Sequence, residues 1–73
     1  MNCFGYTNLD QEKLLTLSEI TFQADAGDLR NLISFLTKCA DEMESDPDWE
    51  HEHLSDFSSN SKNNVDIIVF SKE

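Results

Sequence analysis

The residues from 25 to 47 constrain the fold more than any other part of this sequence. Asp25 is a natural N-cap, and Asp28 places negative charge in the first turn, where the helix dipole favours it. Pro47 disfavours helical backbone at the residue before it, so a helix should end near Asp46. Between these signals, apolar side chains recur at the spacing of an amphipathic helix: Leu29, Leu32, Ile33, Leu36, Cys39, Ala40 and Met43.

Strand-like segments flank this helix. Residues 14–24 alternate apolar and polar side chains, with a change of phase near Ser18 that a β-bulge would reconcile. Residues 65–71 are apolar on both faces, which favours a central strand or a face buried in a dimer. Residues 49–57 fit either a short strand or a loop with a helical turn, and residues 58–64 read as a polar turn.

The order of these segments predicts an α+β fold. One helix would pack on a small, mainly antiparallel sheet of three or four strands in the order β-α-β-β. Residues 14–71 would form the core of a single domain spanning 1–73, and residues 1–13 would be an N-terminal extension or an extra strand. Because so short a chain builds a thin core with exposed sheet edges, a homodimer is compatible with this prediction.

The charge balance restricts the class of partner. The chain has 15 acidic and 5 basic residues and a formal net charge of -10. Such a chain repels nucleic acid and anionic membranes and is attracted to cationic surfaces. The N-terminus has neither the basic start nor the apolar run of a signal peptide, and we find no transmembrane stretch, so we expect a cytoplasmic protein.

An acidic run without Lys or Arg is the strongest functional signal. It contains Asp41, Glu42, Glu44, Asp46, Asp48, Glu50, Glu52 and Asp56. Such a run is often only a solvated face, but Trp49, Leu54 and Phe57 are interleaved with it. Acids around an aromatic anchor are typical of a protein–protein interface. The alternative is that Trp49 and Phe57 cap the core at the end of the helix.

Catalytic and metal-binding patterns are weak. His51 and His53 would share one face of a strand, but no second ligand pair accompanies them, and Cys3 and Cys39 lack metal-ligand spacing. We therefore expect no metal and no cofactor, with His51 and His53 as the weak candidates. No nucleophile-type turn or glycine-rich phosphate loop is present, and a solvated acid run does not raise carboxyl pKa values as a general acid requires. We do not expect an enzyme.

The succession "LSEITFQADAGDLRNLISFLTKCADEME", then "HEHLSDF", then "VDIIVF" resembles the small immunity proteins of bacterial polymorphic toxin systems, in particular immunity protein family 32. The resemblance covers residues 17–70, with "CADEME" leading into "HEHLSDF" as its most distinctive part. It implies a cytoplasmic binder that neutralises a cognate toxin delivered by neighbouring cells. It carries no residue roles with it.

The leading hypothesis is thus a small acidic protein that covers a basic or catalytic surface of a toxin. The residues predicted to contact the partner are Asp46, Asp48, Trp49, Glu50, Glu52, Asp56 and Phe57. Among them, we expect Trp49 to contribute more to binding than any single exposed acid. The alternatives are a DNA-mimic inhibitor of nucleic-acid-binding proteins and a structural domain with a His51/His53 metal site.

Overall fold

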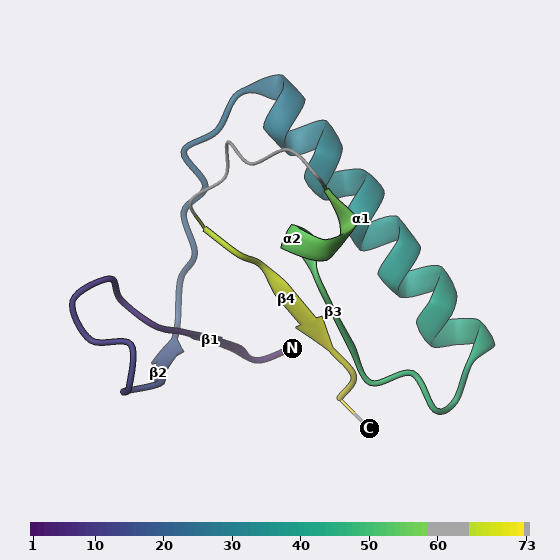
Figure 1. Cartoon of the computed structure of the whole chain (residues 1–73), viewed down its shortest axis with the longest axis horizontal. Helices are drawn as coiled ribbons and strands as arrows, with labels where there is room; N and C mark the ends of the chain where they lie inside the picture. The colour runs from purple at the N-terminus through teal and green to yellow at the C-terminus, as the bar shows by residue number, and fades with distance from the viewer. Residues whose placement is uncertain (59–64, 73) are drawn as a thin grey trace.

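A computed structural model describes residues 1–58 and 65–72 (Figure 1). The elements in chain order are β1 (Cys3–Gly5), β2 (Leu15–Leu17), α1 (Ala26–Ser45), β3 (His51–His53), α2 (Leu54–Phe57) and β4 (Ile68–Phe70). The predicted α+β class is confirmed, and the extra N-terminal strand is present as β1. The strands form two separate antiparallel pairs, β1 with β2 and β3 with β4.

The helix begins and ends where its local signals placed it. The Asp25 carboxylate accepts a hydrogen bond from the backbone N–H of Asp28 at 2.8 Å, and the Asp28 carboxylate accepts one from the N–H of Asp25 at 3.4 Å. This reciprocal capping box satisfies N–H groups that the first turn leaves without a partner. At the other end the backbone becomes extended at Asp46, immediately before Pro47.

The core lies between α1 and the β3–α2–β4 unit. Phe35, Cys39 and Leu54 are buried, and Phe35 is fully inaccessible. The partly buried side chains that pack against them are Leu32, Trp49, Phe57, Ile67 and Val69. The rings of Phe35 and Phe57 lie 5.6 Å apart at 53°, a tilted contact that joins α1 to α2.

The buried face of α1 differs from the predicted stripe. Of the residues in that stripe, Cys39 is buried and Leu32 is partly buried, while Phe35, which the stripe did not include, lies at the centre of the core. The others are exposed: Leu29, Ile33, Leu36, Ala40 and Met43. The apolar side chains of α1 therefore span a wider arc of the helix than the β3–α2–β4 unit covers.

Both main strands are shorter than the apolar segments that contain them. The expected strand at 14–24 forms ladder contacts only in β2, and Ile20 and Phe22 beyond it are exposed. The expected strand at 65–71 is reduced to β4. Hydrogen bonds extend its pairing beyond the ladder, because the N–H of Leu54 donates to Ile67 O and the N–H of Ser71 donates to Glu50 O, each at 2.8 Å.

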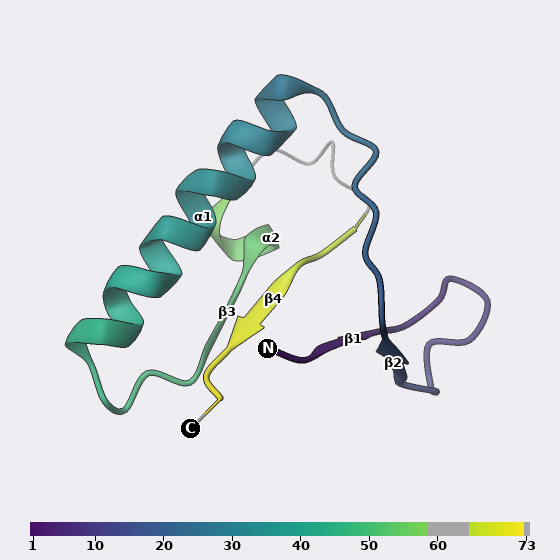
Figure 2. The same ribbon diagram turned by 180° about the vertical axis from the view of Figure 1, so that it is seen from behind.

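Both structures proposed for residues 49–57 occur in succession, as β3 and then the helical turn α2. The predicted polar turn at 58–64 falls, apart from its first residue, outside the described residues. Figures 1 and 2 show α1 along one edge of the molecule, β3 and β4 beside it, and the β1–β2 pair on the far side of β4.

Candidate functional site

The acidic run follows the chain from the last turns of α1, through the turn at Pro47, along β3 and into α2. Asp46, Asp48, Glu50 and Asp56 are all exposed. The turn itself is ordered by Asp46, whose carboxylate accepts the N–H of Asp48 at 2.9 Å and whose carbonyl accepts the N–H of Trp49 at 3.1 Å. Four of the predicted contact acids thus reach solvent from one short stretch of chain.

Two acids of the run point toward a cation instead. The Lys38 ammonium lies 3.1 Å from Glu42 Oε2 and 3.8 Å from Glu52 Oε2. The hydrogen bond to Glu42 raises the pKa of Lys38, and the hydrogen bonds from Lys38 and Trp49 lower the pKa of Glu42. Glu52 faces α1 and not the outer side of the sheet, so Lys38 partly neutralises its charge. Glu52 is the one predicted contact acid for which this is the case.

Trp49 and Phe57, the predicted aromatic contacts, both pack against the core. The Trp49 indole N–H donates to Glu42 Oε1 at 3.0 Å, which fixes the ring over the last turns of α1. Phe57 is half-buried against Phe35. Trp49 also lines a surface hollow, whereas Phe57 is not among the residues that line it.

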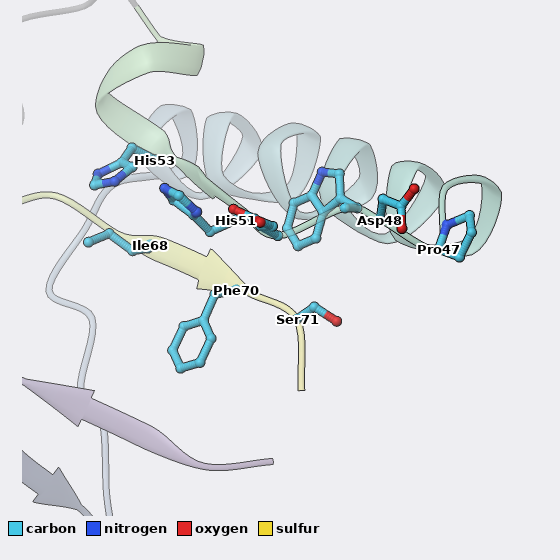
Figure 3. A pocket seen from close by; sticks show the side chains of 9 residues that line it. Pro47, Asp48, His51, His53, Ile68, Phe70 and Ser71 are labelled. Carbon is cyan, nitrogen blue, oxygen red and sulfur yellow. The ribbon is translucent and has the colours of Figure 1, made fainter. Parts of the chain in front are cut away.

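The hollow lies on the outer face of the β3–β4 pair and has a volume of about 670 Å³ (Figure 3). The register places His51 opposite Phe70 and His53 opposite Ile68. Cross-strand partners share one face of a sheet, so these four side chains gather on the side away from α1. The lining residues are Pro47, Asp48, Trp49, Glu50, His51, His53, Ile68, Phe70 and Ser71.

Ile68 and Phe70 were not among the predicted site residues. They are 51% and 61% exposed, so the outer face presents two large apolar side chains to solvent beside the acids. The signal that could have found them was the apolar character of both faces of residues 65–71. One of those faces, with Ile67 and Val69, packs on the core, and the other is exposed.

The two histidines lie edge to face, with ring centroids 5.5 Å apart. His53 Nδ1 lies 2.7 Å from Asp66 Oδ2, and the N–H of Ser55 donates to Asp66 Oδ1 at 3.0 Å. The Asp66 hydrogen bond raises the pKa of His53. Partial burial disfavours the charged form of Asp66, but the hydrogen bonds from His53 and Ser55 outweigh it and lower its pKa.

A metal site at the histidines would need further ligands. Among residues 1–58 and 65–72, no group of three or more His, Cys, Asp or Glu side chains is arranged to hold a metal ion. His53 already uses Nδ1 for its contact with Asp66. The geometry therefore gives the metal-binding alternative no support beyond the pair itself.

The model of the Immunity protein 32 family matches residues 19–72 of the sequence. The chain belongs to this family. The resemblance drawn from the sequence is confirmed, and with it a general role in neutralising a toxin. No curated protein and no solved structure matches the chain.

Family membership favours a non-catalytic inhibitor that binds its toxin. The matched residues include α1, the acidic run and the hollow, and they exclude β1 and β2. None of the helices in the described residues has the length and apolar character needed to cross a bilayer.

Proposed function

We propose that this immunity protein neutralises its toxin in the cytoplasm by placing the outer face of the β3–β4 pair against a basic surface of the toxin. The observation that carries the proposal is the position of Asp48 and Glu50. Both acids line the hollow together with Trp49 and Phe70. Apolar anchors inside a charged border combine desolvated contact area with electrostatic steering.

The acids that would steer the encounter are those that lack a basic partner. No Lys or Arg lies within ion-pair distance of Asp46, Asp48, Glu50 or Asp56 in the described parts of the chain. Their field is thus available to an incoming partner, and the net charge of -10 adds to it at long range. Glu52 would contribute less, because Lys38 lies 3.8 Å away.

The first experiment is capture with the tagged protein from lysate of the native host at low salt and at about 0.15 M salt, followed by mass spectrometry of the bound proteins. We expect one toxin domain that remains bound at the higher salt. A set of many DNA-binding proteins that all wash off with salt would contradict the proposal and favour the DNA-mimic alternative.

A pair of variants then tests the surface itself with the captured toxin. Asp48→Asn combined with Glu50→Gln removes two charges at the hollow, and Glu12→Gln combined with Glu19→Gln removes two exposed charges outside it. We expect the first pair to slow association about tenfold or more, and the second to change it by less than about threefold. Equal effects of the two pairs, measured by stopped-flow or surface binding, would contradict the proposed surface.

A further inference from the structure

One apolar face of α1 is exposed in the part of the chain that the structure describes. Its residues are Leu29, Ile33, Leu36, Ala40 and Met43, which we call the outer seam. The four large side chains are between 37% and 60% exposed. They do not belong to the core, which α1 contacts through Leu32, Phe35 and Cys39.

The spacing of the outer seam is that of a helix-pairing surface. Successive members are four, three, four and three residues apart, which is the alternation of a and d positions in a coiled coil. A surface helix that packs only on its own domain needs one stripe, whereas α1 has its core-facing residues and the outer seam side by side. Figures 1 and 2 show α1 along one edge of the molecule.

The charges beside the outer seam indicate which helix would fit. Arg30, Thr37 and Glu44 follow one flank at intervals of seven residues, all exposed. Arg30 is the sole arginine of the sequence, and it forms no salt bridge within residues 1–58 and 65–72. In a parallel pair this flank would face the opposite flank of the second helix, where Leu32 and Cys39 already belong to the core, whereas an antiparallel pair sets the flank against itself and places Arg30 beside Glu44 twice.

We propose that α1 pairs in antiparallel orientation with α1 of a second copy of this chain, about a twofold axis near Lys38. In this register Ile33 of one copy packs against Met43 of the other, and Leu36 packs against Ala40. The same register brings Arg30 beside Glu44 of the second copy at both ends. The flank is thereby complementary to itself, whereas a uniformly basic partner would oppose Arg30.

The pairing is independent of toxin binding. The outer seam includes none of the residues that line the hollow, so a dimer can present two toxin-contact surfaces. Two copies of net charge -10 repel each other, and added salt screens that repulsion. The dimer should therefore become stronger between about 0.02 M and about 0.3 M NaCl, although the Arg30–Glu44 contacts themselves weaken.

Sedimentation equilibrium from about 1 µM to about 500 µM chain measures the dissociation constant of the dimer. Ile33→Glu places a charge in the outer seam, and Ser34→Glu adds the same charge at the neighbouring exposed position. We expect Ile33→Glu to raise the dissociation constant at least about tenfold and Ser34→Glu to raise it less than about threefold. Both side chains are exposed in the single chain, and circular dichroism will verify that both variants fold.

The orientation is tested by exchanging charges. Arg30→Glu and Glu44→Arg should each weaken the dimer, and the double variant should restore it to within about threefold of the original. A chain that stays monomeric over this range at both salt concentrations would overturn the proposal. A dimer that tolerates Ile33→Glu but is lost with Phe70→Asp would also overturn the proposal, because such a dimer would use the outer face of β4. A double variant that does not restore the dimer would overturn it as well.

Discussion

Trp49 and Phe70 both line the hollow, but their relations to the core are opposite. Trp49 is half-buried, packs on the core and donates a hydrogen bond to Glu42, whereas Phe70 is 61% exposed and lies on the outer face of β4. Trp49 therefore contributes to folding, and in the proposed function it also contributes to binding. The Phe70 side chain, by contrast, can be removed without disturbing the core.

Truncation of each residue should separate these roles. Trp49→Ala removes core packing and leaves Glu42 without its indole donor, so the free energy of unfolding should fall by about 2 kcal/mol. Phe70→Ala should change it by less than about 0.5 kcal/mol, yet weaken toxin binding about tenfold or more. Denaturant titration and calorimetric binding measure the two quantities. If Phe70→Ala binds as the unaltered protein does, the hollow is not the anchor.

His53 and Asp66 should give stability a pH dependence whose sign follows from their pKa shifts. The raised pKa of His53 stabilises the fold fully below the unfolded value of about 6.5 and loses this effect as the pH rises through the folded value. The lowered pKa of Asp66 stabilises the fold above the unfolded value of about 3.9 and loses this effect as the pH falls through the folded value. The pair is therefore most effective between about pH 4 and about pH 6.5.

We expect the melting temperature of the unaltered protein to exceed that of a His53→Asn variant at about pH 6, and the difference to shrink by about pH 8.5. His51→Asn is the matched control, because its imidazole makes no hydrogen bond within the described residues. A difference between the unaltered protein and His53→Asn that stays constant over this range would show that the contact with Asp66 does not depend on charge.

At the scale of elements, the helix and the strands obey different rules. The bounds of α1 depend on local contacts, such as the Asp25–Asp28 capping box and the backbone change before Pro47. Those contacts lie within a few residues in the sequence, so the sequence predicts them well. The ladders of β2 and β4 depend on a partner strand distant in sequence, and each ladder ends where its partner ends.

The buried face of α1 shows why the core was harder to predict than the helix. Leu32, Phe35 and Cys39 have helical spacing, but so do Leu29, Ile33, Leu36 and Met43, and periodicity alone does not say which set meets the sheet. The β3–α2–β4 unit covers only the first set. Tertiary packing determines which of the two sets is buried, and the periodicity of the sequence does not predict that packing.

The exposure of the acids was easier to predict from the sequence than the positions of the apolar side chains beside them. Asp46, Asp48, Glu50 and Asp56 are exposed as an acidic interface requires, because exposed acids need no special environment. Phe57 and part of Trp49 serve the core, and Phe70 takes the outer position instead. The pairing of His51 with Phe70 in the β3–β4 register joins the acidic run to an apolar residue far along the chain.

For the whole molecule, the net charge of -10 sits on a body with a small core. Unfolding lets the charges move apart, so their mutual repulsion favours the unfolded chain. The described residues hold two Lys38–carboxylate contacts and the His53–Asp66 contact to offset this repulsion. Electrostatic repulsion therefore lowers the free energy of unfolding, and added salt reduces this effect.

The melting temperature should accordingly rise with NaCl from about 0.02 M to about 0.3 M, because a Debye length that falls below about 10 Å screens repulsion across the molecule. The Asp48→Asn and Glu50→Gln pair removes two negative charges, so that variant should melt higher at low salt and respond less to added salt. Calorimetry at about 1 µM chain, where self-association is weak, isolates this effect from pairing through α1. A melting temperature that salt leaves unchanged in both proteins would mean that the acids are already compensated within the fold.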